Sequence, residues 1–181
     1  MISAKSKSLD ILRVCVIGPE CTGKTTLSEN LARELGTVWV PEYARGYLSK
    51  LNHPYGQPDL LKIAHGQLRM EDEWASDAKG VLVCDTNLLV IKVWSEHKFG
   101  SCDPEIMQRH RERKYHLYLL TDIDVPWEED PQREHPQLRE HFRNIYTSLI
   151  QSSGVPFVQI RGTLQQRLTG AIDAVRALAV N

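Results

Sequence analysis

The stretch "GPECTGKTTL", from Gly18 to Leu27, follows directly on the apolar run "ILRVCVI" of residues 11–17. It contains Gly18-x-x-x-x-Gly23-Lys24-Thr25, which is the pattern of a phosphate-binding loop when a strand precedes it and a helix follows. The glycines let backbone N–H groups turn toward phosphate oxygens, and the positive N-terminal end of the next helix adds to the attraction. The stretch therefore predicts a site for a nucleoside triphosphate.

The same pattern predicts separate roles for its residues. Lys24 is expected to reach the terminal phosphates, and the Thr25 hydroxyl to bind Mg²⁺. The expected cofactors are therefore Mg²⁺ and a triphosphate, either ATP or GTP, and the kinase interpretation below takes ATP. The other residues expected to contact the nucleotide here are Gly18, Glu20, Cys21, Thr22, Gly23 and Thr26.

Short apolar runs alternate with helical patterns along the rest of the chain. The runs are 11–17, 80–85, 115–120 and 155–160, with a weaker one at 37–40. Strands that are apolar on both faces are typical of a parallel sheet covered by helices on each side. The order predicts an α/β protein of the P-loop NTPase class, with five mostly parallel strands flanked by helices.

Three local patterns predict helices. Leu27, Leu31 and Leu35 recur at helical spacing after the loop, and Asp103-Pro104-Glu105 has the composition of a helix start. Thr163 and Gln166 have the spacing of a capping box for a last helix. The apolar stripe expected on that helix comprises Leu164, Leu168, Ala171, Ile172, Val175 and Leu178.

Length and composition limit the classes of protein. With 181 residues, the chain is expected to form one domain over 11–181 after a flexible tail at 1–10. The formal net charge of -1 argues against a nucleic-acid-binding face, and no apolar stretch reaches the length of a membrane span. The four cysteines show no paired framework, which favours a reducing, cytoplasmic compartment and leaves the oligomeric state open.

Three classes of P-loop protein compete. A GTPase normally carries Asn-Lys-x-Asp, which is absent, and a motor ATPase normally has a second acid where Thr86 follows Asp85. A small-molecule kinase needs an acceptor pocket and a mobile basic lid that excludes water. The segment "PEYAR" (41–45) and the charged lid segment (122–142) meet those needs, and Arg133 and Arg139 could clamp the transferring phosphoryl group.

With these segments assembled, the chain resembles the ribosylnicotinamide kinase domain of NadR-type proteins. The matching pieces are "GPECTGKTTL", "VWVPEYAR", "CDTNLLVIKVWSEHKFG", "LLTDIDVPWEEDPQREHP" and "GVPFVQIRG", which run in order from about residue 14 to 165. The resemblance implies a nucleoside-kinase-like fold and phosphorylation of nicotinamide riboside to nicotinamide mononucleotide. Two alternatives stay open: a kinase of another nucleoside or small metabolite, and an ATP-binding regulatory module.

The resemblance also implies roles for pocket residues. Asp85 would bind the metal or its water, or the ribose, and either Glu42 or Asp85 would be the general base. Tyr43, Arg45 and Asn87 would complete the wall of the substrate pocket. No histidine has metal-ligand spacing, and all seven are expected on the surface or on helix faces.

The two rings of the expected ligands suggest further contacts. Nicotinamide riboside carries a flat cationic ring, for which an aromatic clamp is expected from Trp94 and Trp127. For adenine, the segment 160–163 is the expected reader, with Arg161 able to stack on the base and Gly162 offering its backbone.

Overall fold

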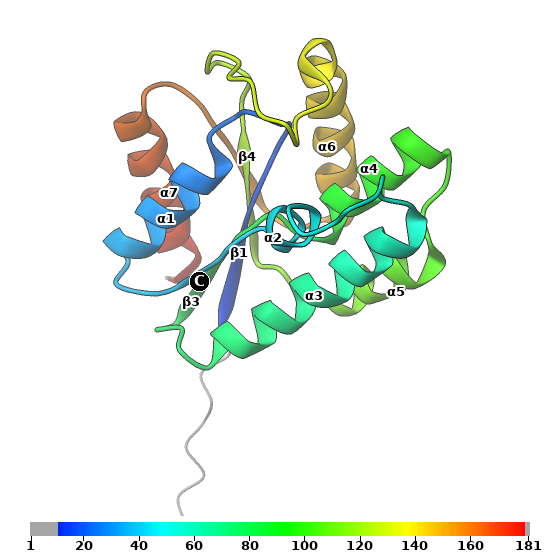
Figure 1. The fold of residues 1–181 in the computed structure, drawn as a ribbon. Helices are drawn as coiled ribbons and strands as arrows, with labels where there is room; N and C mark the ends of the chain where they lie inside the picture. Colours follow the sequence, from blue (N-terminus) through cyan, green and yellow to red (C-terminus); the bar gives the residue numbers. More distant parts are fainter. Residues whose placement is uncertain (1–10, 180–181) are drawn as a thin grey trace, which may run out of the picture.

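The computed structural model describes residues 11–179, and the expected tail at 1–10 lies outside them. One sheet has the strand order β2-β3-β1-β4-β5, and every pairing is parallel (Figure 1). The strands are β1 (Leu12–Ile17), β2 (Trp39–Val40), β3 (Val81–Asp85), β4 (Leu117–Thr121) and β5 (Phe157–Ile160). The α/β prediction and all five predicted strands are confirmed, and the weak candidate is a two-residue strand at the sheet edge.

Helices cover both faces of the sheet (Figure 1). One face carries α1 (Lys24–Glu34) and α7 (Leu164–Ala179). The other carries α4 (Leu88–Phe99) and α6 (Arg139–Ser153), with α2 (Tyr43–Leu48), α3 (Gln57–Ala75) and α5 (Pro104–Glu112) beyond them. A short 3₁₀ turn, Pro136–Leu138, leads into α6. No helix among residues 11–179 is both long and apolar enough to cross a bilayer.

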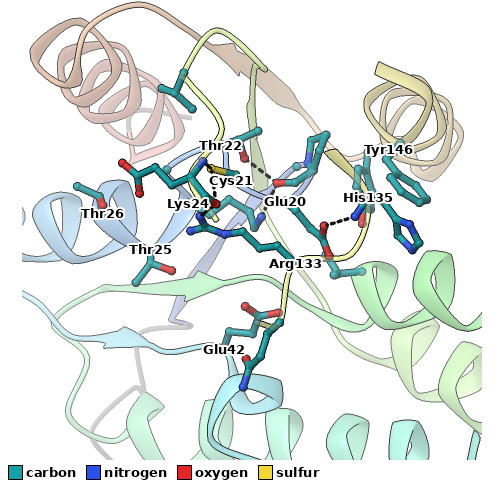
Figure 2. Close-up of a pocket in the computed structure, with 18 of the residues that line it drawn as sticks. Glu20, Cys21, Thr22, Lys24, Thr25, Thr26, Glu42, Arg133, His135 and Tyr146 are labelled. Atoms are coloured by element: carbon teal, nitrogen blue, oxygen red, sulfur yellow. Dashed lines mark hydrogen bonds between the residues drawn. The ribbon is translucent and has the colours of Figure 1, made fainter. Parts of the chain in front are cut away.

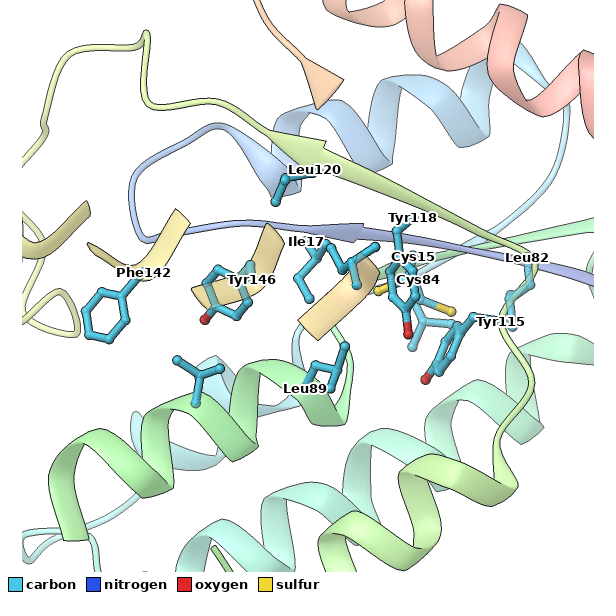
Figure 3. Close-up of a cluster of buried hydrophobic side chains, with 13 residues drawn as sticks. Cys15, Ile17, Leu82, Cys84, Leu89, Tyr115, Tyr118, Leu120, Phe142 and Tyr146 are labelled. Carbon is cyan, nitrogen blue, oxygen red and sulfur yellow. The ribbon is translucent and has the colours of Figure 1, made fainter. Parts of the chain in front are cut away.

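Alternation along β1 divides the core into two layers. Val14 and Val16 pack with the apolar faces of α1 and α7, whereas Cys15 and Ile17 pack with α4 and α6. Figure 3 shows the second layer, in which Cys15 and Ile17 lie beside aromatic side chains. All four cysteines are free thiols, as predicted, and Cys15 and Cys84 are buried.

The predicted helix starts are present, with one correction. The Asp103 carboxylate accepts the backbone N–H of Glu105 (2.8 Å), and Thr163 and Gln166 bond reciprocally at the start of α7. Leu168, Ala171 and Val175 are buried on the predicted stripe. Leu164 is 47% exposed, so its predicted burial is wrong. It lies in the first turn of α7, at the edge of a cavity rather than over the sheet.

The parallel register brings three loop starts to one edge. Val16 pairs with Asp85 at the end of β3, and Ile17 pairs with Leu120 near the end of β4. The loop after β1, the Asp85 carboxylate and the lid segment (122–142) therefore leave the sheet together. This is the edge at which α/β sheets bind ligands.

A buried carboxylate ties α3 to the amino end of β4. Glu71 on α3 is fully buried, and its Oε1 accepts the hydroxyl of Tyr115 (2.8 Å). Its Oε2 lies 3.8 Å from Nε of Arg113 without a hydrogen bond. Burial raises the pKa of Glu71 to about 7, and the Tyr115 hydrogen bond and Arg113 oppose this only in part.

This geometry predicts a pH-dependent stability for Glu71→Gln. Because the pKa of Glu71 is higher in the folded chain than in the unfolded one, the wild type loses stability as the pH rises from about 4.5 to about 7. The glutamine variant lacks this loss, so above pH 7 it should unfold with a free energy larger by about 3 kcal/mol. Urea unfolding at several pH values measures this, with the exposed Asp77→Asn as control. Parallel curves for wild type and Glu71→Gln would contradict it.

Candidate active site

The loop after β1, residues 18–25, has a backbone that only glycine allows at Gly18. Gly18 has φ of +153°, and a Cβ there would overlap the Thr121 hydroxyl and lie 2.9 Å from the Thr121 carbonyl oxygen. Cys21 and Gly23 also have positive φ, and Gly23 caps α1. The loop therefore lies directly against the end of β4, with the N-terminal end of α1 behind it.

Side chains of the loop hold its shape. The Thr22 hydroxyl lies 2.8 Å from the Pro19 carbonyl oxygen and 2.7 Å from the Thr121 hydroxyl. Nζ of Lys24 donates to the same Pro19 carbonyl (2.6 Å). Burial lowers the pKa of Lys24, and the nearby carboxylates of Glu42 and Asp85 oppose that shift.

Asp85 lies beside the loop as predicted. Its Oδ2 accepts the Thr25 hydroxyl (2.6 Å), whereas its buried Oδ1 has no hydrogen-bond partner. The next residue, Thr86, has φ of +70°, an uncommon conformation for a β-branched residue that occurs most often at functional positions. Burial raises the pKa of Asp85, and the Thr25 hydrogen bond opposes this.

The Thr25–Asp85 pair has the chemistry of a Mg²⁺ site. Carboxylate and hydroxyl oxygens are the ligands Mg²⁺ takes, and it usually keeps several waters. The unpartnered Oδ1 of Asp85 offers such an oxygen. Among residues 11–179, no group of three or more His, Cys, Asp or Glu side chains could hold a metal alone. These two residues thus fit a metal that is shared with phosphate and water.

A cavity of about 500 Å³ joins the loop to the helices on the α4 side of the sheet. Figure 2 shows Lys24 and Arg133 on one side of it and Glu42 projecting from the opposite side. A second cavity, of about 630 Å³, shares Thr25, Glu42 and Arg45 with the first and also reaches Asp85. The loop and the segment after β2 therefore face each other across a continuous space.

Glu42 is the N-cap residue of α2, directly after β2. Its Oε2 lies 3.8 Å from Nε of Arg45, whose Nη1 donates to Asp130 of the lid segment (3.0 Å). Burial raises the pKa of Glu42, and the negative charge of Asp85 raises it further. A carboxylate with a raised pKa in a cleft is suited to accept a proton near neutral pH.

The lid segment (122–142) is held to the loop by polar contacts. The Glu20 carboxylate accepts the backbone N–H groups of Glu134 (3.1 Å) and His135 (3.2 Å). Figure 2 shows the bond to His135. The Cys21 thiol accepts the N–H of Glu128 (3.1 Å). The helix α6 begins at Arg139, so the last residues of the predicted lid form its first turn.

The two predicted arginine clamps are placed differently. Arg133 lines the first cavity and donates to the Glu128 carbonyl oxygen, while its buried Nε has no partner. Arg139 does not line either cavity, and its Nη2 donates to the carbonyl oxygens of Cys21 (2.9 Å) and Val125 (3.0 Å). Arg139 therefore braces the lid segment against the loop.

The two tryptophans predicted for the aromatic clamp also differ in position. Trp94 lines the first cavity, and its Nε1 donates to the hydroxyl of Tyr55 (2.6 Å). Trp127 lines neither cavity, and its Nε1 donates to Glu129 (3.1 Å). Phe142 and Tyr146 of α6 line the cavity instead.

Three other predicted residues lie away from the first cavity. Asn87 is buried and caps α4 by accepting the N–H of Leu89 (3.0 Å). Tyr43 lines only the second cavity, and its backbone N–H donates to Gln67 (2.9 Å). Arg161 is exposed and lines neither cavity. All predicted loop residues line the first cavity, together with Glu42, Arg45, Trp94, Arg133 and Gly162.

Sequence reasoning missed several lining residues. Phe142 and Tyr146 are four residues apart, a spacing that places them on one face of a helix directly after the lid segment. That signal was available. His135 was expected on the surface but lines the cavity beside Phe142. Arg167 has no local signal, because its contacts with Thr22 and Asp124 join residues far apart in the sequence.

Comparison with known proteins gives a consistent set of relatives. The AAA_28 family model, described as an AAA domain, matches residues 13–167. The trifunctional NAD biosynthesis/regulator protein NadR of Escherichia coli K12 is 25% identical over 186 residues, covering 98% of this chain and 45% of that protein. The chain thus spans less than half the length of this relative.

Solved structures show the fold. A NadR protein in complex with NR superposes with a TM-score of 0.78 at 23% identity, over 93% of this chain and 51% of that one. A NadR protein in complex with NAD and AMP-PNP superposes with a TM-score of 0.78 at 22% sequence identity, over 94% of this chain and 50% of that one. Deoxyadenosine kinase from M. mycoides superposes with a TM-score of 0.62 at 11% sequence identity, over 92% of this chain and 100% of that one. The fold is that of P-loop nucleoside and nucleotide kinases.

The geometry of the loop predicts the effect of Gly18→Ala. A Cβ at this φ would strain the backbone by about 1–3 kcal/mol. Because it would also overlap Thr121, we expect the phosphate loop to shift. We expect the Kd for ATP with Mg²⁺, measured by calorimetry, to rise by roughly tenfold or more. Gly170→Ala is the matched control, since a Cβ there meets only Ile160 at 3.9 Å. An unchanged Kd in Gly18→Ala would refute this account of the loop.

Proposed function

The chain belongs to the AAA_28 family of AAA domains, and on that premise we propose that it is an ATP-dependent kinase of nicotinamide riboside. It would phosphorylate the 5′-hydroxyl and release nicotinamide mononucleotide and ADP. One observation carries the proposal: a single cavity contains Lys24 of the phosphate loop, Glu42 opposite it and an aromatic wall beyond. A nucleotide switch has no need of an enclosed acceptor space beside the terminal phosphate.

The comparisons support the two substrates. A relative of the same fold is known in complex with NR and another with AMP-PNP, a nucleotide of the ATP type. The curated relative of this chain acts in NAD biosynthesis, according to its name. Four free cysteines support a reducing, cytoplasmic setting.

Residues of the loop would bind the donor. Backbone N–H groups between Gly18 and Thr25, with the N-terminal end of α1, would surround the phosphates. Lys24 would exchange the Pro19 carbonyl for phosphate oxygens, and Arg133 would turn from Glu128 to the transferring group. Thr25 and Asp85 would hold Mg²⁺, which when bound offsets negative charge on the phosphates.

The transfer itself needs orientation more than covalent chemistry. The 5′-oxygen of the riboside forms a bond to the γ-phosphorus while the bond from that phosphorus to the bridging oxygen of ADP breaks. The proton of the hydroxyl passes to a carboxylate. The lid segment (122–142) covers the loop through Glu20 and Cys21, which would keep water from competing as acceptor.

The surroundings of the two candidate bases favour Glu42. Asp85 already accepts the hydroxyl of Thr25, the group proposed to bind Mg²⁺. Glu42 faces the first cavity from the opposite side, and burial raises its pKa. We therefore assign Glu42 as the general base and Asp85 as the residue that holds Mg²⁺ or its water.

The aromatic wall suits a flat cationic ring. Trp94 is fixed by its hydrogen bond to Tyr55, and the two rings meet edge to face with centroids 4.8 Å apart. Phe142 and Tyr146 line the same cavity from α6. A pyridinium ring between such faces gains cation–π attraction, which a neutral nucleobase does not. This contrast is the reason to rank nicotinamide riboside before ordinary nucleosides.

The first test is acceptor-dependent formation of ADP from ATP and Mg²⁺. We expect nicotinamide riboside to stimulate ADP release far more than adenosine, cytidine, uridine or thymidine. Lys24→Ala should lower the stimulated rate by about 100-fold or more, because it removes a preorganised cation at the transferring group. The exposed Lys62→Ala is the control. Stimulation by another nucleoside would overturn the substrate, and no stimulation by any acceptor would favour a regulatory ATP-binding module.

The base assignment has its own test. Glu42→Gln should lower kcat by about 10²–10⁴-fold at saturating Mg²⁺, and it should remove the acidic limb of the pH profile. In the wild type that limb should lie above the ordinary pKa of glutamate, because burial raises the pKa of Glu42 and only the deprotonated form accepts a proton. Asp85→Asn should instead raise the Mg²⁺ concentration needed for half-maximal rate. If Asp85→Asn removes the acidic limb and Glu42→Gln raises the Mg²⁺ requirement, then Asp85 is the base and Glu42 is not.

A further inference from the structure

Arg167 on α7 connects segments that are far apart in the sequence. Its side chain is 4% exposed. Nη1 donates to the carbonyl oxygen of Thr22 in the phosphate loop (2.7 Å), and Nε donates to the carbonyl oxygen of Gly162 between β5 and α7 (2.9 Å). Nη2 forms an ion pair with Asp124 at the start of the lid segment. One guanidinium thus contacts all three segments.

Asp124 closes the same network. While one of its carboxylate oxygens binds Arg167, the other accepts the backbone N–H of Gly162 (2.5 Å). The planar fork of arginine can serve several acceptors in fixed directions at once, which a lysine cannot. The carboxylate is 35% exposed, so the network begins at the surface and ends in the buried loop.

The network fixes the segment expected to lie against the adenine. Both backbone polar groups of Gly162 are engaged, its N–H by Asp124 and its carbonyl by Arg167. Gly162 has φ of +93°, and a Cβ there would overlap the Gln166 side chain. Gly162 and the next two residues, Thr163 and Leu164, line the first cavity. The backbone of Gly162 is therefore held in place on both sides.

The hydrogen bonds of Arg167 go to loops and not to the core. Besides Thr22, Gly162 and Asp124, Nη2 lies 3.4 Å from the carbonyl oxygen of Asp122. Each of these acceptors belongs to the phosphate loop, to the lid segment or to the loop after β5. We therefore expect replacement of the guanidinium to act first on how these loops sit relative to one another.

We propose that Arg167, with Asp124, is a positioning residue for the nucleotide: the pair locks the phosphate loop and the base-side loop at one separation. This inference rests on the proposed function in one respect, that the first cavity binds ATP. A nucleotide reaches from the loop at Thr22 to the segment at Gly162, so its affinity depends on the distance between them. Arg167, which also lines the first cavity, sets that distance through its hydrogen bonds to the carbonyl oxygens of Thr22 and Gly162.

Two variants test the proposal by binding of ATP with Mg²⁺ in the absence of acceptor. Arg167→Lys keeps the charge but cannot contact all three segments, and we expect its Kd for ATP to rise about tenfold. Asp124→Asn keeps the shape and loses the charge, and its Kd should rise in the same direction. The double variant should bind ATP with the same Kd as Arg167→Lys alone, because both substitutions disrupt one hydrogen-bond network. Arg176→Lys, exposed on the same helix, is the matched control.

Kinetics and unfolding complete the test. With nicotinamide riboside as acceptor, KM for ATP should rise in Arg167→Lys while kcat and KM for the acceptor change little. If the wild type binds ATP and the Kd in both variants equals that of the wild type, the proposal is wrong, whatever happens to the thermal midpoint. If Arg167→Lys does not fold, Asp124→Asn decides alone. A wild type that binds no ATP overturns the proposed function itself.

Discussion

The parallel hydrogen bonding of β1 between β3 and β4 is the constraint from which the site follows. Because the three strands run in one direction, their carboxyl ends meet at one edge. The register then sets Val16 against Asp85 and Ile17 against Leu120. The loop that begins at Gly18 thus starts beside both a carboxylate and Thr121. A register shifted by one residue would turn Asp85 to the opposite face of the sheet.

The cations and carboxylates of the site are only partly paired with one another. Lys24 and Arg133 each donate to a backbone carbonyl, and Arg45 lies between the carboxylates of Glu42 and Asp130. Burial raises the pKa values of Glu42 and Asp85 and lowers that of Lys24, so it disfavours the charged form of each group. An anionic ligand with a divalent cation would restore charge partners on both sides. Binding of the proposed ligand would therefore offset the unfavourable burial of these charged groups.

The sequence predicted those parts of the site that are encoded locally. The loop pattern, the strands and the position of Asp85 each depend on residues within about ten positions of one another, so they could be read directly. Both Trp94 and Trp127 were predicted for the aromatic clamp, with Trp127 favoured, but only Trp94 lines the first cavity, because tertiary packing decides which side chains face a cavity. Arg167 was missed for a related reason. It bonds to Thr22 across 145 residues, and nothing near it in the sequence marks that contact.

The lid segment is held in a way that differs from the core. Its contacts with the loop and with α2 are hydrogen bonds and ion pairs, such as Cys21 with Glu128 and Arg45 with Asp130, whereas His135 and Phe142 pack against His97 of α4. Partly exposed contacts of this kind are worth about 1 kcal/mol or less each, against roughly 1.5–3 kcal/mol for each buried aliphatic side chain of the sheet layers. Breaking these polar contacts alone would therefore cost little beside unfolding. Because Glu20 and Cys21 of the phosphate loop bond to backbone N–H groups inside this segment, any opening of the segment would also change the contacts of the phosphate loop.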